Sequence, residues 1–274
     1  GGRAVISARL QSAANNLCFV NPADSQIKRI FMTLASNKLN GFSNEDVKAL
    51  SEPLTMTTIN IYTQVIDGFL PTPEKCHYLF NLRDIAKIFQ GIYLADTKVH
   101  EQKEQIVRMW YHECCRVFMD RLINHEDREK FRNLLDAAMD NGLQVRQKEI
   151  DGGDPDFVFA ALDLSNPEAE DAVYDYMHDR TSDSGLKKFM ESRNEDYNAM
   201  FKKSPMSLVM FKEAVEICCK VLRILKQPQG NALLIGVGGS GRHCQTRLAS
   251  FIAFYKCFSI EITKQYKHNA FLED

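Results

Sequence analysis

Hydrophobic residues recur every three or four positions through the first half of the chain, which is the period of helices that bury one face. The first such helix is expected to have Asp24 or Ser25 as its N-cap, and its inward face to comprise Ile27, Ile30, Phe31 and Leu34. More helices are expected after the sequence SNED, with a break at Pro53, and then over residues 74–91, 98–122 and 125–139. The first half is therefore predicted to be a bundle of helices.

The second half has a different pattern. Residues 150–205 are polar and rich in turn-forming residues, apart from the β-like run FVFAALDL, so we expect a partly ordered connector. An amphipathic helix then ends at Pro228, with apolar positions Val209, Met210, Ala214, Ile217, Cys218, Val221, Leu222 and Leu225. The run ALLIGV at 232–237 is typical of a buried parallel strand, and a glycine loop, a helix over 242–255 and a second strand at 257–262 follow.

The glycine loop carries the clearest chemical signal in the sequence. Glycine tolerates positive φ and lets backbone N–H groups approach phosphate oxygens, and the N-terminus of the following helix favours the same anion. The spacing from Gly236 to Gly241 is that of a P-loop. We therefore predict that the phosphates of ATP or ADP are bound by Gly236, Gly238, Gly239, Ser240, Gly241, Arg242 and His243.

Two positions of the loop depart from the P-loop pattern. Arg242 replaces the lysine, and it keeps the positive charge in a forked, planar group. His243 replaces the hydroxyl residue, and imidazole is a poor substitute for the oxygen ligand that Mg²⁺ prefers. We expect nucleotide binding with slow or absent hydrolysis, and Mg²⁺ binding stays open.

Two other interpretations of the loop remain. A glycine-rich turn without any ligand would have the same composition. The residues also match the G-x-G-x-x-G pattern of dinucleotide sites, although Glu261 lies near the end of the second predicted strand, offset from the acidic position of that fold.

Composition narrows the classes of partner. The net charge of −2 is spread over both signs, so neither nucleic acid nor a membrane is expected as a partner, and no apolar run has the length of a membrane span.

Eight cysteines without a C-x-x-C pair indicate reduced thiols in the cytosol, and the consecutive residues 112–115 (HECC) do not predict a metal site. The absence of an initial Met, and an end soon after the glycine loop, suggest a fragment.

Three segments resemble the dynein heavy chain, particularly its axonemal forms. They are LPTPEKCHYLFNLRDIAKIFQGI (70–92), RMWYHECCRVFMDRLI (108–123) and NALLIGVGGSGRHCQTRLASF (231–251). The resemblance implies an α/β but helix-dominated fold, in which a small AAA+ helical lid precedes the start of a P-loop AAA+ large subdomain. It implies four parts: the end of the third AAA+ large subdomain (1–22), its helical lid (23–142), a connector (143–205) and the N-terminal part of the fourth large subdomain (206–274).

The same resemblance assigns roles to two arginines. Arg83 in the motif NLRD matches the second-sensor arginine, which reaches from the lid to the nucleotide of the third module. Arg9 falls where an arginine finger would point at the nucleotide of the second module, and an ordinary surface arginine is an equal alternative. The stretch from Gly1 to Ala4 reads GGRA where the family reads GGRN, so the sensor asparagine is missing.

The resemblance implies a segment of a dynein motor ring, an ATP-driven, minus-end-directed microtubule motor of cilia and flagella. The implied partners are the other AAA+ modules of the same heavy chain, dynein intermediate and light chains, and microtubules through regions outside this chain. The implied location is the cytoplasm, the cytoskeleton and the ciliary axoneme. The rival interpretation is a non-catalytic P-loop scaffold or signalling module, which binds partners and no nucleotide.

Overall fold

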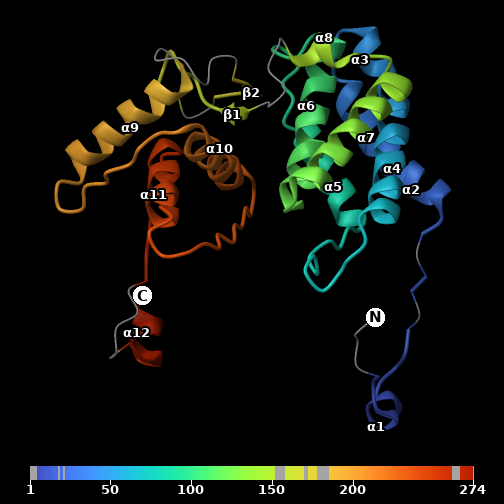
Figure 1. The fold of residues 1–274 in the computed structure, drawn as a ribbon, viewed down its shortest axis with the longest axis horizontal. Coiled ribbons are helices and arrows are strands. Elements are labelled where there is room, and N and C mark those ends of the chain that lie inside the picture. Colours follow the sequence, from blue (N-terminus) through green and yellow to red (C-terminus); the bar gives the residue numbers. More distant parts are fainter. Residues whose placement is uncertain are drawn as a thin grey trace.

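The computed structural model describes residues 5–17, 19–20, 22–151, 158–169, 172–177, 185–260 and 266–273. Helices dominate the described part, and none of them is long and apolar enough to cross a bilayer (Figure 1). The elements are α1 (Ala8–Ser12), α2 (Asp24–Leu39), α3 (Glu45–Ala49), α4 (Ser51–Gly68), α5 (Leu82–Ile92), α6 (Lys103–Val117), the 3-10 turn η1 (Met119–Arg121), α7 (His125–Leu143), α8 (Gln147–Asp151), β1 (Phe159–Ala161), β2 (Tyr174–Tyr176), α9 (Leu186–Met200), α10 (Lys212–Lys226), α11 (Arg242–Ile252) and α12 (His268–Glu273).

Helices α2 to α8 form a first helical unit with a closed core, as the period of the sequence predicts. The rings of Phe31 and Phe89 stack with their centroids 5.1 Å apart, and the buried Trp110 donates its indole N–H to Thr58 Oγ1 at 2.8 Å. The predicted inward positions of α6 and η1 are all buried: Ile106, Trp110, Val117, Phe118 and Leu122. Satisfied polar atoms and stacked rings give this unit a specific interior.

The predicted N-cap of α2 is wrong, because Ala23 takes that position in place of Asp24 or Ser25, and the predicted inward face is partly wrong. Ile27 and Phe31 are buried, but Ile30 is 53% exposed and Leu34 is 40% exposed. The buried residues follow a strict four-residue spacing: Ile27, Phe31, Ala35 and Leu39. A stripe with this spacing turns slowly around the helix, so the small residue Ala35 lies in the core in place of the larger Leu34.

Two predicted helix boundaries also need correction. The chain breaks at Leu50, between α3 and α4, and Pro53 lies in the first turn of α4, where its missing N–H has no helical partner to lose. The helix expected over residues 74–91 begins only at Leu82. Asn81 and Asp84 form a reciprocal capping box there: Asn81 Oδ1 accepts from the N–H of Arg83, and Asp84 Oδ2 accepts from the N–H of Asn81.

Helices α9, α10 and α11 form a second helical unit. The sequence between 186 and 200 was expected to be connector, and it is instead the helix α9. Its buried residues are Leu186, Phe189, Met190 and Tyr197, which is helical spacing within a polar stretch. Tyr197 and Phe251 of α11 meet edge to face at 5.5 Å, so α9 belongs to the core of this unit.

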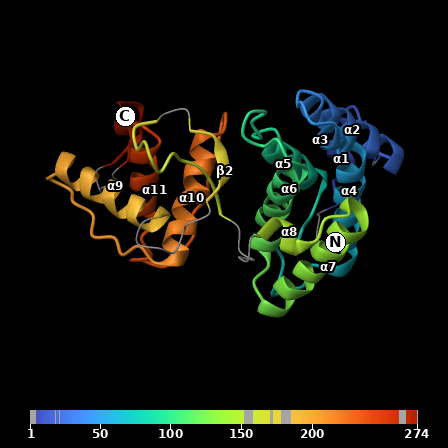
Figure 2. The ribbon, with the colours of Figure 1, turned by 90° about the horizontal axis from the view of Figure 1, so that it is seen from above.

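A two-stranded antiparallel sheet lies between the two units (Figures 1 and 2). Phe159 pairs with Tyr176, and Ala161 pairs with Tyr174. Phe159, Ala161 and both tyrosines join the core of the first unit, whereas Val158, Ala160, Leu162 and Met177 join the core of the second. Because successive side chains of a strand point to opposite faces, one short strand contributes to both cores.

The two predicted parallel strands do not form among the described residues. Residues 232–237 are not paired with any described strand, and Leu233, Ile235 and Val237 are 86%, 84% and 80% exposed. Residues 257–260 are likewise without strand structure, and the remainder of that predicted strand, with Glu261, lies outside the described residues. A strand is defined by backbone pairing, and no described segment supplies a partner to either run.

Candidate nucleotide-binding sites

The glycine loop has the backbone that a phosphate cradle requires at two of its four glycines. Gly239 and Gly241 have φ of 81° and 76°, in the region that other residues rarely adopt, whereas Gly236 and Gly238 are outside that region. A Cβ atom at Gly238, Gly239 or Gly241 would meet nothing within 4 Å, so the loop faces open space. At Gly236 such an atom would lie 2.9 Å from Ser240 Oγ, so a larger residue there would require the Ser240 side chain to move.

Helix α11 begins directly after the loop, at the predicted residue. Gly241 is its N-cap, and no side chain caps the first turn. The first N–H groups of a helix have no partner within the helix, and they carry the positive end of its dipole. The loop and α11 therefore present backbone donors in one place, which is the arrangement that binds phosphate groups.

Arg242 and His243 stand at the mouth of this arrangement. Arg242 is half-buried, and its Nη2 donates to the carbonyl oxygen of Val237 at 3.4 Å, whereas His243 is exposed. The nearest hydroxyl on α11 belongs to Thr246, which donates to the carbonyl oxygen of Arg242 at 2.9 Å. A hollow of about 360 Å³ beside the loop is lined by Leu234, Arg242, His243, Thr246, Arg247, Cys257, Phe258 and Ser259. Two arginines in this lining favour an anionic ligand.

Arg83 and Arg9 lie away from the glycine loop. Arg83 is exposed on the first turn of α5, and its guanidinium makes no hydrogen bond or ion pair with the residues that the structure describes. Arg9 is exposed on α1, a five-residue helix without buried residues. Figure 1 places α5 in the first unit, α11 in the second and α1 apart from both. The predicted site residues are thus distributed over separate places, whereas residues Gly1 to Ala4 lie outside the described part.

The first turn of α5 is held by the 3-10 turn η1. Arg121 donates both Nη atoms to the buried carboxylate of Asp84, and its Nη1 also donates to the carbonyl oxygen of Leu79 at 3.1 Å. The guanidinium carbon of Arg121 lies 5.3 Å from the centre of the Phe80 ring. The sequence alone does not reveal this contact, because Asp84 and Arg121 are 37 positions apart and each alone resembles a surface charge.

A buried inter-unit cluster comprises Glu113, Arg116, Tyr174 and Arg223. Arg223 of α10 donates to Glu113 Oε2 of α6 at 2.8 Å, and Tyr174 of β2 donates to Glu113 Oε1 at 3.0 Å. Arg223 Nε also donates to the Tyr174 hydroxyl oxygen at 3.1 Å, and Arg116 Nε donates to Glu113 Oε2 at 2.9 Å. The side chains of Glu113 and Arg223 are 0% and 3% exposed. The cluster therefore joins both helical units through their sheet.

Electrostatics keeps the Glu113 carboxyl charged in this cluster. Burial opposes ionisation, but the guanidinium groups of Arg116 and Arg223 hold the pKa of Glu113 below its ordinary value. Gly91 makes room for this carboxylate, because a Cβ atom there would lie 2.1 Å from Glu113 Cδ. In the sequence, Glu113 stands out only as part of the HECC run. The available signal was its position three residues after Trp110, on the buried side of a helix.

His112 lies beside this cluster, on the sheet-facing side of α6. Its ring centre is 4.8 Å from that of Phe159 on β1. Burial lowers the pKa of His112 to about 4, so the imidazole is neutral at physiological pH.

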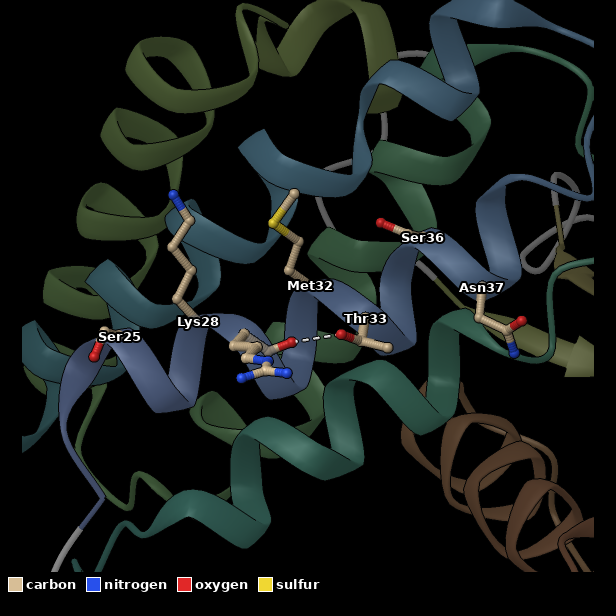
Figure 3. A pocket seen from close by; sticks show the side chains of 7 residues that line it. Ser25, Lys28, Met32, Thr33, Ser36 and Asn37 are labelled. Carbon is tan, nitrogen blue, oxygen red and sulfur yellow. Dashed lines mark hydrogen bonds between the residues drawn. The ribbon is translucent and has the colours of Figure 1, made fainter.

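A separate hollow of about 560 Å³ runs along α2 and contains no predicted site residue (Figure 3). All of its lining residues come from one face of that helix: Ser25, Lys28, Arg29, Met32, Thr33, Ser36 and Asn37. Thr33 Oγ1 donates to the carbonyl oxygen of Arg29 at 2.8 Å, so its hydroxyl proton is already used within the helix. The hollow is an open groove with a mostly apolar lining surface.

Comparison with known protein families agrees with this geometry. Residues 33–128 match the model of the dynein heavy chain ATPase lid domain, and residues 206–274 match that of the P-loop containing dynein motor region D4. The class of the fold is thus an AAA+ helical lid followed by the start of a large subdomain, and the predicted helix-dominated α/β fold is confirmed.

Whole-chain comparison identifies the family. The chain is 42% identical over all its 274 residues to dynein axonemal heavy chain 2 of Mus musculus, and 42% identical to the dynein-1-beta heavy chain of the flagellar inner arm I1 complex of Chlamydomonas reinhardtii. It is 39% identical to dynein axonemal heavy chain 1 of Mus musculus. The chain spans 6% of the length of each of these relatives. It belongs to the dynein heavy chain family, with axonemal members as relatives.

Proposed function

We propose that this chain is a segment of a dynein motor ring, in which its helical lid covers one nucleotide site and its glycine loop forms part of the next. The glycine loop carries this proposal, because open backbone donors, a helix N-terminus and two arginines converge beside one hollow. On this proposal the phosphates of ATP or ADP contact Gly236, Gly238, Gly239, Ser240, Gly241, Arg242 and His243.

The second nucleotide site is proposed to hold nucleotide without rapid hydrolysis. His243 is exposed where a P-loop has its metal-binding hydroxyl, and the hydroxyl of Thr246 is hydrogen-bonded to its own helix. A Mg²⁺ ion would have to reach the phosphates with few protein ligands from this segment. The role of the site is then regulatory or structural within the ring.

The proposed wider context follows the family. The neighbouring AAA+ modules of the same heavy chain, dynein intermediate and light chains, and microtubules outside this segment are the proposed partners. The proposed place of action is the axoneme of a cilium or flagellum, within the cytoskeleton and cytoplasm. Arg83 is proposed to contact the nucleotide under the lid, and Arg9 to act as an arginine finger toward another module.

Replacing Arg242 by Ala tests the nucleotide site. In a protein extended through the fourth module, the variant should bind fluorescent ADP more weakly by about 1.5–3 kcal/mol, the range of a charge-assisted hydrogen bond. Lys202→Ala is the control, because Lys202 is exposed and does not line this hollow, so its removal should leave the affinity for ADP unchanged. An unchanged affinity in Arg242→Ala shows that Arg242 points elsewhere.

The same titration separates the motor proposal from the rival scaffold. A non-catalytic scaffold or signalling module would leave the loop without nucleotide even at saturating ADP or ATP. Binding with a measurable dissociation constant contradicts the scaffold. Retention of bound ATP, measured by extracting the nucleotide after incubation, then distinguishes a static site from a hydrolysing one.

A further inference from the structure

The first turn of α5 is fixed by contacts from outside its own helix. The carboxylate of Asp84 is buried, and it accepts from the N–H of Asn81, from Lys87 Nζ at 3.3 Å and from both Nη atoms of Arg121. A carboxylate with this many donors has little freedom to rotate, because each rotation would leave a buried oxygen without a partner.

Arg121 extends this contact to the loop that leads into α5. It donates to the carbonyl oxygen of Leu79, while its own carbonyl oxygen lies 3.0 Å from His77 Nε2. One guanidinium therefore ties the loop, the cap and the first turn of α5 to the end of α6. The neighbouring Arg83 differs from Arg121. Its guanidinium extends from the first turn of α5 and has no hydrogen-bond or ion-pair partner among the described residues.

We infer that Asp84 and Arg121 are positioning residues, which hold the first turn of α5 so that the free guanidinium of Arg83 faces the nucleotide under the lid. This inference rests on the proposed role of Arg83. The contact between Asp84 and Arg121 fixes the backbone from which Arg83 projects. The entropy cost of ordering this segment is therefore met when the protein folds, and it does not weaken nucleotide binding. Neither positioning residue needs to touch the nucleotide.

The test is a double-mutant cycle in the complete heavy chain that carries this segment. Binding of fluorescent ADP to the third-module site is measured after the P-loops of the other modules are inactivated. Arg83→Ala is expected to weaken binding by roughly tenfold or more. Arg121→Ala is expected to weaken it in the same range, and the double variant to bind no more weakly than Arg83→Ala alone.

Matched variants separate positioning from folding. Asp84→Asn keeps the shape and one acceptor oxygen of the side chain but removes its charge. Arg121→Lys keeps the charge but loses the forked pair of donors. Both variants should weaken ADP binding, and they remain informative if Arg121→Ala does not fold. Lys48→Ala is the control, because Lys48 pairs with the exposed carboxylate of Glu45 on α3 and contacts neither Asp84 nor Arg121. It should bind as the parent does.

Two results would overturn parts of this scheme separately. If Arg83→Ala binds ADP as tightly as the parent, Arg83 does not contact the nucleotide under the lid, and its proposed role is contradicted. The positioning role alone is contradicted if Arg83→Ala weakens binding as expected but Arg121→Lys and Asp84→Asn bind ADP as the parent does. It is also contradicted if the losses of Arg83→Ala and Arg121→Ala add up in the double variant.

Discussion

The two helical units differ in how completely each buries its own apolar residues. In the first unit the largest side chains of α4 to α7, such as Trp110, Tyr111 and Phe131, are buried, and the polar atoms of Trp110 and Tyr111 have partners within the same unit. In the second unit the core under α10 and α11 is closed, but the run at 232–237 keeps three large aliphatic side chains exposed. The difference follows from the type of element, because a helix satisfies its own backbone and a strand needs a neighbour.

The largest expected effect comes from the inter-unit cluster, because we expect its buried contacts to couple the unfolding of the two units. Glu113→Gln removes the charge that compensates Arg116 and Arg223, and the loss of one partner of a buried ion pair costs about 3–5 kcal/mol. Urea unfolding measures this loss of stability. The fluorescence of Trp110, the single tryptophan, reports unfolding of the first unit, and circular dichroism reports unfolding of all helices.

The control for this prediction is Glu52→Gln, which removes an exposed pair with Lys28 and should leave the midpoint unchanged. In the parent the two signals should change together, and in Glu113→Gln they should separate. Coincident transitions at the parental midpoint would mean that the cluster does not join the units.

The next effect compares a leucine of each unit directly. Leu135 is buried on α7, so Leu135→Ala should lower the free energy of unfolding by about 2–5 kcal/mol. Leu233 is exposed in the unpaired run, and Leu233→Ala should change it by less than about 0.5 kcal/mol. Equal losses in chemical denaturation would show that residues 232–237 are buried in solution.

A smaller effect tests the packing between α5 and α6. Gly91→Ala should destabilise the first unit by about 1–3 kcal/mol, because the new methyl group would overlap Glu113, which the cluster prevents from moving. The intrinsic preference of alanine for helices would act in the opposite direction. Gly68→Ala is the matched control, since its nearest neighbour would be Lys130 Nζ at 3.6 Å. A rise in the melting temperature of Gly91→Ala would contradict the close contact.

The smallest effect concerns pH. The folded state lowers the pKa of His112 from 6.5 to about 4, so the unfolded chain binds more protons between these values. Stability contributed by neutral His112 is therefore present above pH 6.5 and is lost as the pH falls toward 4. Melting temperatures across this range should depend less on pH in His112→Gln than in the parent. His125→Gln, at an exposed position, should keep the parental slope.

The sequence predicts the parts of this structure that are local. The helical period locates α6, α7 and α10, and the glycines locate the loop and the start of α11. Two predicted positions of the α10 stripe, Val209 and Met210, precede that helix, and Val209 and Ile217 are exposed. The capping box at Asn81 is also a local signal, but prolines 71 and 73 gave a competing helix start, and the box was missed. Helix α9 was missed because its polar surface hid four buried positions.

The remaining features depend on contacts between distant residues. Glu113 and Arg223 are 110 positions apart, and each is a charged residue in an apolar helical stripe, which single-sequence reasoning assigns to the surface. The strand at 232–237 was predicted from its apolar composition, but composition cannot supply a pairing partner. The site residues themselves stay predictions until nucleotide binding is measured.

The strand between the two units also limits how the chain can change in length. One residue inserted between Val158 and Phe159 would shift the strand by one position, so that Phe159 would face the second core and Ala160 the first. The comparison with dynein axonemal heavy chain 1 of Mus musculus extends over 285 positions against 274 residues here, so that relative contains insertions. We expect them to fall in turns such as 163–169, where added length leaves the alternation of β1 intact.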